Sequence, residues 1–491
     1  MNQTRPIKLL DRLQRFTWAA FLLALPVTSF PFFPPAVGGE ALVRPLSIYP
    51  LLILIAVAVL PRLFTRPLPR TLLSLLPFVF VALASSLISL LSGIEPALGI
   101  SVNARVLRGV FTLAIGCAVY LTVALLPESE ADLAFSLRWI LIGCALALFW
   151  GSLQAVYIIH FDERWFSLLS RMQEFISTRR LLPDRISGLT YEPHWFAEQI
   201  NVLLVPAALA GILNRRTVFP WRWKWLTVEW LLMGWAIALL PFTYSRSGVL
   251  NLILLTSISV LIIRLKHARD KSSLPAGLAP ARQSRFHHLL EAMLVLLVLI
   301  VPIYLIGQKN QFFARLWEYW QHPEQIPNTY LSYLGLDARL VFNEAAYNTY
   351  QAHPFLGVGL GNYAFYFEEM LPYRPLSNIP EVLLMITPEP GRDRLVTAKN
   401  LYLRLLAETG MLGTAAFFAF LIANLGCALF LWLSPRKISH HWGAVSLCGF
   451  FAISLSAFTY DSFVIPNMWV MLGIISAAPH VLGRQYPEEG L

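Results

Sequence analysis

The chain has 491 residues, of which 57% are hydrophobic and 13% charged, and it carries a formal net charge of +10. Soluble domains hold about 25% charged residues, so this composition excludes an ordinary soluble protein. The positive charge would suggest a nucleic-acid ligand in a soluble protein, but in a membrane protein it indicates basic cytoplasmic loops. We therefore expect an all-α polytopic membrane protein that contacts the lipid bilayer and has no nucleic-acid partner.

Apolar runs long enough to cross a bilayer recur along the whole chain. We expect about twelve transmembrane helices, at residues 15–31, 46–62, 71–92, 105–126, 134–158, 193–213, 226–243, 247–265, 287–307, 403–433, 442–459 and 465–483. The basic stretch before the first run is followed by no small-residue cleavage site, so no cleavable signal peptide is expected. The cysteines all fall in apolar runs, which indicates neither a disulfide framework nor a metal site (Cys117, Cys144, Cys427 and Cys448).

The short loops predict which side of the membrane each segment faces. With the N-terminus inside, most short inside loops are basic, as in "RLFTRPLPR" and "NRRTVFPWRWKW", although "PESEAD" is an exception. The long segments 159–192 and 308–402 then lie outside. We expect three regions: helices 1–9 in residues 1–307, an extracytoplasmic loop with short helices at 308–402, and helices 10–12 with a cytoplasmic tail at 403–491.

The first polar outside segment runs over residues 176–204 and enters the sixth expected helix. It carries Arg185, Glu192, His194 and Glu198 close together in sequence. Periodicity puts Glu192 and Glu198 on different faces of a helix, and Glu198 is expected to be a polar cap at the membrane interface. Arg185 and Glu192 stand among small residues and a proline, where a functional and a structural role fit equally well.

A second polar segment, "LLPFTYSRSGVLNLILL", places Arg246 in a connection of a few residues between two spanning helices. A cation at bilayer depth costs roughly 2.5–3.5 kcal/mol on insertion scales and usually faces a partner or a water-filled cavity. The alternative is a side chain that reaches to the interface. The neighbouring Tyr244, Ser245, Ser247 and Gly248 are typical of a small polar pocket, so we favour ligand binding.

The large outside loop contains an expected helix at 335–352, followed by "HPFLGVGLGNY". Pro354 ends the helix, because the residue before a proline avoids the α region. A dinucleotide fingerprint would need a buried strand before its glycines and a helix after them. Here no buried strand precedes the glycines and no helix opens on the last of them, and no ATP or NAD pool exists outside the cell. The glycines are expected to shape a loop beside a membrane cavity.

Two stretches, "RLVFNEAAYNTYQAHPFLGVGLGNY" and "KNLYLRLLAETGMLG", together resemble the core signature of the O-antigen ligase and O-antigen polymerase (Wzy) superfamily. "TYSRSG" and "RISGLTYEPHWFA" are similar to its two upstream arginine motifs. The resemblance covers roughly residues 180–415 and implies an integral-membrane glycosyltransferase of the GT-C type. The positions that fit are Arg339, His353, Pro354, Gly357, Gly359, Gly361, Asn400, Leu403, Glu408, Gly410 and Gly413.

The resemblance implies a donor glycan on a polyprenyl diphosphate at the outer face of a bacterial inner membrane. The acceptor would be a second lipid-linked glycan, or lipid A-core in a ligase, and a chain-length regulator is an expected partner. Arginine forks bind phosphate oxygens bidentately, so Arg185 and Arg246 are the first candidates for the diphosphate. Arg339, Lys399, Asn400 and Tyr244 are further candidates for substrate binding. The outside loops show no DxD-like carboxylate cluster, so we expect no metal and no other cofactor.

Glu192, His194 and His353 are the candidate bases for the acceptor hydroxyl, although His353 beside a helix-ending proline is typical of a structural residue. Lys399 stands where the ligases carry a histidine. An unperturbed lysine has a pKa of about 10.4, so it is expected to be a cationic contact instead of a base. This departure favours a polymerase over a ligase or a protein O-oligosaccharyltransferase.

A small-solute or bicarbonate-type transporter is the alternative from another class, because some such proteins resemble the same superfamily. Transporters favour discontinuous helices at the midplane and internal repeats. The two halves of this sequence show no convincing repeat, and the candidate polar residues gather on the outside face.

Overall fold

The computed structural model describes residues 4–33, 41–272, 301, 304, 311–321, 329–373, 376, 379–387 and 395–485. In this part of the chain, eight helices are long and apolar enough to cross a membrane. The strands of the described residues are β1 (Arg222–Trp223) and β2 (Leu226–Thr227), which form one antiparallel hairpin. The prediction of an all-α polytopic membrane protein is confirmed.

Each expected span coincides with a described helix or a run of adjoining helical segments, except 287–307, which lies almost wholly outside the described residues. The N-terminal helices are α1 (Thr4–Ala24), α2 (Ile48–Leu54) with η2 (Ile55–Val59) and α3 (Leu60–Thr65), α4 (Arg70–Ser89), α5 (Val102–Leu125), α6 (Glu130–Ile159) and α7 (Glu163–Gln173). The central ones are α8 (Pro193–Gln199) with η3 (Ile200–Leu204) and α9 (Val205–Leu213), α10 (Val228–Leu239) with η4 (Leu240–Thr243), and α11 (Arg246–Ser272). The later ones are α13 (Gln311–Gln321), α14 (Tyr330–Tyr333), α15 (Asp337–Ala352), α16 (Tyr363–Tyr366), α17 (Pro380–Ile386), α18 (Leu401–Leu433), α19 (Lys437–Ser456) and α20 (Asn467–Gln485).

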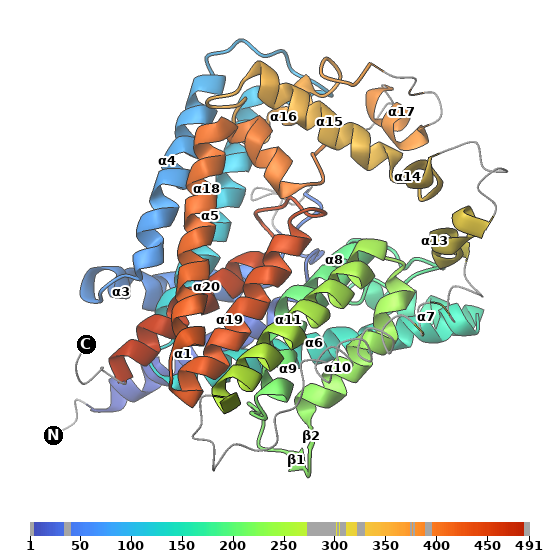
Figure 1. Cartoon of the computed structure of the whole chain (residues 1–491). Coiled ribbons are helices and arrows are strands. Elements are labelled where there is room, and N and C mark those ends of the chain that lie inside the picture. The colour runs from blue at the N-terminus through green and yellow to red at the C-terminus, as the bar shows by residue number, and fades with distance from the viewer. Residues whose placement is uncertain are drawn as a thin grey trace.

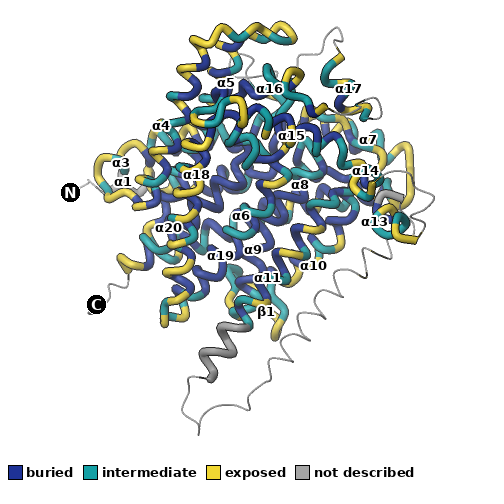
Figure 2. Tube along the Cα trace, turned by 45° about the horizontal axis from the view of Figure 1, so that its top comes forward, coloured by how far each residue is buried: buried dark blue, intermediate teal, exposed yellow. Residues whose placement is uncertain are grey.

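The spanning helices form a bundle that is covered at one end by short helices. Helices α4, α5 and α18 stand upright side by side, α15, α16 and α17 lie across the upper end, and the β1–β2 hairpin projects from the lower end (Figure 1). Helix α18 packs against α4 and α19, and α20 packs against α5 and α19. Buried residues run through α8, α9 and α19 (Figure 2), and 89% of the apolar window at Pro193–Leu213 is buried.

The loops expected on one side of the membrane meet one another in the structure. Glu128, which precedes α6, forms ion pairs with Arg62 (2.6 Å) and Arg66 (3.0 Å) after the second expected span. At the other end, the backbone N–H of Lys399 donates to Asp461, which lies between α19 and α20, at 2.8 Å. The two sets of loops therefore occupy opposite ends of the bundle, and which end faces the cytoplasm stays a prediction.

Helix α18 is interrupted at Gly410, where the sequence predicts one continuous helix over 403–433. Gly410 has φ 62° and ψ −166°, a conformation outside the helical region. The loop after α15 docks against this break: Val358 N–H donates to the Ala407 carbonyl (3.0 Å) and Gly359 N–H to that of Glu408 (2.9 Å). Backbone groups freed in a membrane protein need such partners, because no bulk water is available to them.

Two motifs in the sequence are thus the two sides of one junction. Gly357 has φ +65°, and a Cβ atom there would lie 2.5 Å from the Ala407 carbonyl oxygen. Gly361 has φ +82° and its carbonyl accepts from Nε of Arg105 on α5 at 2.8 Å. Glycine adopts a positive φ without strain at both positions, and at Gly357 the neighbouring backbone also leaves no room for a Cβ atom. This segment, which we call the glycine loop (residues 357–361), donates hydrogen bonds to the carbonyls at the helix break and accepts one from the Arg105 side chain.

Candidate functional site

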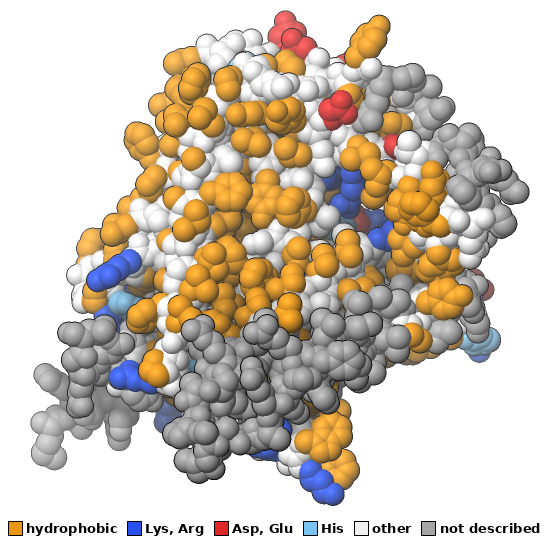
Figure 3. All heavy atoms as spheres, in the orientation of Figure 1, with side chains coloured by type: hydrophobic (Ala, Val, Ile, Leu, Met, Phe, Trp, Pro, Cys, Tyr) orange, Lys and Arg blue, Asp and Glu red, His pale blue; other side chains and the backbone are white. Residues whose placement is uncertain are grey.

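Basic side chains gather in a recess between α15 and α8. Figure 3 shows Lys and Arg side chains there, on a face that is otherwise largely hydrophobic. Segments far apart in sequence contribute to this region: the connection before α8, the start of α8, α15, the start of α18 and the connection between α19 and α20.

His194, in the first turn of α8, lies at the centre of the basic region. The charges of four cations act on its imidazole: Arg339, Lys399, Arg185 and Arg179. Arg339 comes from α15 and Lys399 from the residue pair before α18, while the two other arginines precede α8. The fold therefore gathers cations from three parts of the chain around one histidine.

Glu192, the residue before α8, is engaged by one of these cations. Its carboxylate forms an ion pair with the guanidinium of Arg179. The same guanidinium lies 5.0 Å from the ring centroid of Tyr191. The Glu192 carboxylate is therefore already engaged by a cation.

Arg185 belongs to a loop that is fixed on both sides. The side-chain oxygen of Gln154 accepts from the Gly188 N–H at 3.0 Å, and the Ile186 N–H donates to the carbonyl of Phe242 at 3.0 Å. Nε of Arg185 is buried and has no hydrogen-bond partner among the described residues. A buried donor without a partner is rare, and a site that a ligand completes accounts for it.

Arg339, in the first turns of α15, is half-buried and sits between carboxylates of two other segments. Burial lowers the pKa of Arg339, while the charges of Glu381 and Asp461 raise it. A guanidinium nevertheless remains protonated in proteins at neutral pH. Arg339 is thus a permanent cation on one of the helices that cover the bundle.

Lys399 and Asn400 have different roles at the start of α18. Asn400 caps the helix: its side-chain oxygen accepts from the N–H groups of Tyr402 (3.0 Å) and Leu403 (3.2 Å). Lys399 has an exposed side chain and a φ of 58°, which is uncommon for a residue other than glycine. Its N–H donates to Asp461, so this carboxylate holds the strained residue in place.

Sequence reasoning missed Asp461 and Arg404 as members of the site. Nε of Arg404 donates to Glu408 at 2.9 Å, and another nitrogen of its guanidinium donates to the Asp461 carbonyl. The Arg404 guanidinium also lies 5.0 Å from the ring of Phe463. Two signals were present: the i, i+4 spacing of Arg404 and Glu408 on a helix, and a single carboxylate in a short connection between two spans.

We call this group the outer cluster. It contains Arg105, Arg179, Arg185, Arg339, Lys399 and Arg404 with Glu192, Glu381, Glu408 and Asp461 around His194. Among the described residues, its six cations outnumber its four carboxylates, so the described part of the cluster has an excess of positive charge.

Arg246 and Tyr244 lie beside α13 and α14. The Arg246 guanidinium donates to the Leu334 carbonyl, and the charge of Arg315 acts on it. The Tyr244 ring is 6.1 Å from that of Phe313, edge to face. The structure therefore brings Arg185, Arg339 and Lys399 together at His194 and places Arg246 against the helices next to this region.

Two of the residues expected to line a polar pocket at Arg246 serve helix α11 instead. The Ser245 hydroxyl accepts from the Gly248 N–H at 3.1 Å, which caps the start of the helix. Gly248 packs against α8: a Cβ atom there would lie 2.4 Å from the Cβ of Ala197. The serine and the glycine are explained by local structure.

His353 and Glu198 are held by structural contacts. The His353 N–H donates to Thr349 at the end of α15 (3.0 Å), and its imidazole lies 5.2 Å from the Tyr366 ring. Glu198 is only 7% exposed and accepts from the side-chain amide of Asn467 at 2.6 Å. The expected interfacial cap is therefore a buried carboxyl group inside the bundle.

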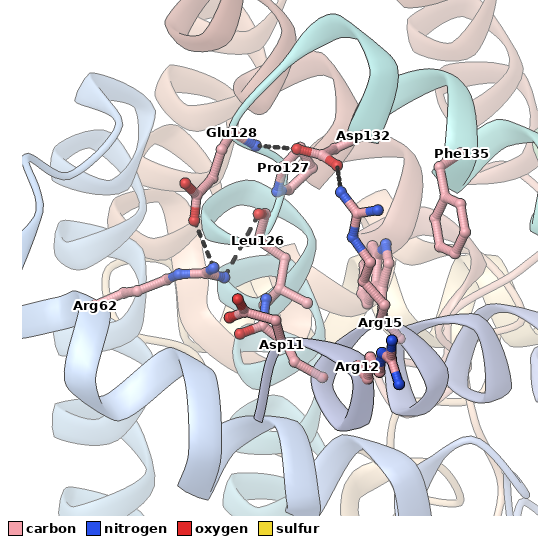
Figure 4. Close-up of a pocket in the computed structure, with 11 residues that line it drawn as sticks. Asp11, Arg12, Arg15, Arg62, Leu126, Pro127, Glu128, Asp132 and Phe135 are labelled. Atoms are coloured by element: carbon pink, nitrogen blue, oxygen red, sulfur yellow. Dashed lines mark hydrogen bonds and ion pairs between the residues drawn. The ribbon is translucent and has the colours of Figure 1, made fainter. Parts of the chain in front are cut away.

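A separate cavity of about 470 Å³ lies at the opposite end of the bundle, between α1, α3 and the start of α6. Four of its six charged lining residues form two ion pairs: Arg62 contacts Glu128 at 2.6 Å and Arg15 contacts Asp132 at 3.5 Å (Figure 4). We call this group the paired pocket. It lacks the positive excess of the outer cluster.

Among the residues that the structure describes, no three His, Cys, Asp or Glu side chains come together as metal ligands. Residues 231–418, less than half of the chain, match a family model described as O-antigen ligase. The matched region contains Arg246, Arg339 and Lys399, whereas Arg185 and His194 precede it. No curated protein matches the chain. The family match supports the resemblance to the O-antigen ligase and polymerase superfamily.

Proposed function

From the O-antigen ligase match over residues 231–418, we propose that this chain is a membrane glycosyltransferase that uses a polyprenyl-diphosphate-linked oligosaccharide. It acts at the extracytoplasmic face of a bacterial inner membrane and polymerises repeat units into O-antigen or another surface polysaccharide. The partners are the lipid-linked donor, a lipid-linked glycan acceptor, the bilayer and a chain-length regulator.

The excess of cations at His194 is the observation that supports this reaction. In the transfer, the bond between the anomeric carbon and the diphosphate oxygen breaks, and its electron pair goes to the diphosphate. A new bond forms between that carbon and the acceptor hydroxyl oxygen, which loses its proton. Fixed cations that face the developing negative charge lower the barrier, because they need no reorganisation during the step.

The candidate residues bind different parts of the substrate, according to where they lie in the recess. Arg185 carries a buried donor that has no partner in the described part of the chain, and Arg339 is a permanent cation across the recess. These two bind the diphosphate, together with Arg246 on the side of α14. Lys399, with its exposed side chain, contacts a phosphate or an acidic sugar.

The proton of the acceptor hydroxyl has one candidate acceptor inside the outer cluster. His194 is surrounded by the cations, whereas Glu192 is engaged by Arg179 and His353 packs on Tyr366. General-base catalysis is typically worth 10²–10⁴-fold. The neighbouring cations disfavour a protonated imidazole, and a diphosphate stabilised by several arginines is a good leaving group. The contribution of His194 as a base therefore falls at the low end of this range.

An O-antigen ligase is the second candidate within the enzymes, and the description of the matched family favours it. The residue before Asn400 favours the polymerase, because a lysine replaces the histidine of the ligases. A protein O-oligosaccharyltransferase shares that histidine and is disfavoured on the same ground.

A transporter is the candidate from another class, and the break in α18 is the feature that favours it, since transporters use discontinuous helices. At this break, however, the freed backbone groups of Ala407 and Glu408 are occupied by the glycine loop. They are therefore not available to coordinate a transported ion.

The test is transfer by purified protein in nanodiscs. A lipid-linked repeat unit supplied alone should be extended to longer lipid-linked chains, as seen on a gel of the labelled glycan. Product that forms only after lipid A-core is added identifies a ligase. No glycan transfer with either acceptor, by protein that shows a cooperative thermal transition, would overturn the proposed enzyme class.

A further inference from the structure

The connection between α9 and α10 forms a projecting hairpin with a firmly held base. Glu229, in the first turn of α10, is 1% exposed and accepts from the Thr217 hydroxyl (2.8 Å) and the Val218 N–H (2.9 Å). Nε of Arg138 donates to the Val218 carbonyl at 2.7 Å. The buried carboxylate ties both ends of the connection together, so the hairpin projects from a fixed platform.

The tip of the hairpin exposes tryptophans to an extent that is unusual for large apolar side chains. Trp221, Trp223 and Trp225 are 47%, 63% and 71% exposed, and Trp230 on the adjoining helix is 41% exposed. The rings of Trp225 and Trp230 are 6.0 Å apart, edge to face. Figure 3 shows hydrophobic and basic side chains at the lower projection, where Figure 1 places β1 and β2.

Cations alternate with these tryptophans along the chain. Arg222 and Lys224 are exposed, and Arg222 pairs with Thr227 and Trp223 with Leu226 across the two strands. Neighbouring side chains of a strand point to opposite faces, so Trp223 and Arg222 face different directions. Nε of Arg222 donates to the Lys224 carbonyl at 3.0 Å, which leaves its two terminal nitrogens for a ligand.

We propose that this hairpin binds the head groups of anionic phospholipids in the leaflet at this end of the bundle. The hairpin joins α9 directly to α10, so it lies at the membrane surface by its place in the chain. Tryptophan concentrates at the interface between hydrocarbon and water, and lysine and arginine near the surface are attracted by anionic lipids. Aromatic and cationic side chains on one short fixed hairpin satisfy both conditions.

Thermal unfolding of the full-length protein in detergent tests this proposal. A thiol-reactive dye reports unfolding, because the cysteines are free and lie in the bundle (Cys117, Cys144, Cys427 and Cys448). Micelles that contain dioleoyl phosphatidylglycerol should raise the Tm more than micelles with the same fraction of dioleoyl phosphatidylcholine. In the double variant Arg222→Gln/Lys224→Gln, the phosphatidylglycerol concentration for half-maximal effect should rise about 25-fold, since each cation near a surface contributes roughly fivefold.

The matched control is Arg164→Gln/Arg171→Gln on α7, which removes two exposed cations elsewhere and should keep the preference for phosphatidylglycerol. An equal loss in this control would mean a general charge effect and would overturn the proposal. Glycerol 3-phosphate at the same concentration should stabilise the wild-type protein and Arg222→Gln/Lys224→Gln to the same extent, because any binding of it would be at the outer cluster. Stabilisation that is lost in the double variant would mean that the hairpin binds free phosphate and not a membrane surface, and would overturn the proposal. Equal stabilisation of the wild-type protein by both lipids would also overturn the proposal.

Discussion

The outer cluster and the paired pocket both contain several arginines, but their charges are arranged differently. In the paired pocket, Arg15 and Arg62 each contact their own carboxylate, Asp132 and Glu128. In the outer cluster, as far as the structure describes the chain, Arg185 keeps a buried nitrogen without a partner and cations outnumber carboxylates. The paired pocket includes exposed ion pairs, which contribute little to stability. The excess of cations and the unpartnered nitrogen of Arg185 among the described residues are what favour a site for an anionic ligand at the outer cluster.

This difference also shows why cavity size alone does not identify the functional end of the molecule. The paired pocket is a cavity of about 470 Å³, yet its charges are already balanced. The outer cluster is recognised by its charge and by its unsatisfied donor. Equivalent changes at the two ends should therefore have different effects on glycan transfer.

The largest effect is expected at Arg185. Arg185→Ala should lower kcat/KM for the lipid-linked donor by about 10³-fold, the loss typical of one fixed donor to a developing anion. Arg185→Lys should recover little, because one ammonium cannot reproduce the guanidinium fork. Arg15→Ala in the paired pocket is the control and should change the rate less than about twofold. Equal losses at both positions would remove the distinction between the two ends.

The next effect is expected at Arg246, which contacts α14 and lies beside the outer cluster. Arg246→Ala should lower glycan transfer by about 10²-fold or more while the protein still inserts and folds. Size-exclusion profiles and Tm values check folding, and radiolabelled product measures transfer. Full activity in Arg246→Lys would show that a generic charge suffices and that Arg246 is not a phosphate clamp.

Asp461 tests whether a carboxylate of the outer cluster positions Lys399. Asp461→Asn keeps an oxygen that can accept from the Lys399 N–H (2.8 Å in the native protein) but removes the charge. The expected loss is about tenfold in kcat/KM, in line with hydrogen bonds to charged groups. Glu128→Gln makes the same change in the paired pocket and should leave transfer unchanged. A loss only in the Glu128 variant would reverse the comparison.

Lys399 should show a smaller effect, because its side chain is exposed. Lys399→Arg is expected to keep most of the activity, and Lys399→Met to lose about fivefold, the scale of an exposed charge contact. The loss should appear in KM more than in kcat. If Lys399 were a deprotonated base, the arginine variant would be as inactive as the methionine one, and rates measured against pH would separate the two roles.

The smallest effect is expected from chelation. Transfer by the purified protein should keep its rate in EDTA, because fixed cations of the outer cluster are proposed to neutralise the leaving diphosphate. The rate is compared before and after dialysis, with added Mg²⁺ or Mn²⁺ as the second condition. Loss on chelation and recovery with either metal would contradict the account based on arginines and lysine alone.

The sequence by itself determined the helical segments and several of the candidate residues. A spanning segment must satisfy its backbone groups internally and cover its surface with apolar side chains, so its signal is local and readable. The expected helix at 335–352 agrees with α15, and the residues chosen on the outside face include Arg185, His194, Arg339 and Lys399. These residues stand in short local motifs, so they could be chosen as candidates from the sequence alone.

Only the tertiary structure decided how these residues are partnered. Asp461 meets Lys399 across 62 positions of sequence, and the glycine loop meets the break at Gly410, so neither contact leaves a local signal. Glu198 shows the same limit of sequence reasoning. Its place near a helix start predicted an interfacial cap, but its carboxyl group is buried and accepts a hydrogen bond from Asn467. Hydrophobicity is a property of each segment, whereas a charge acquires its role from the groups that folding brings beside it.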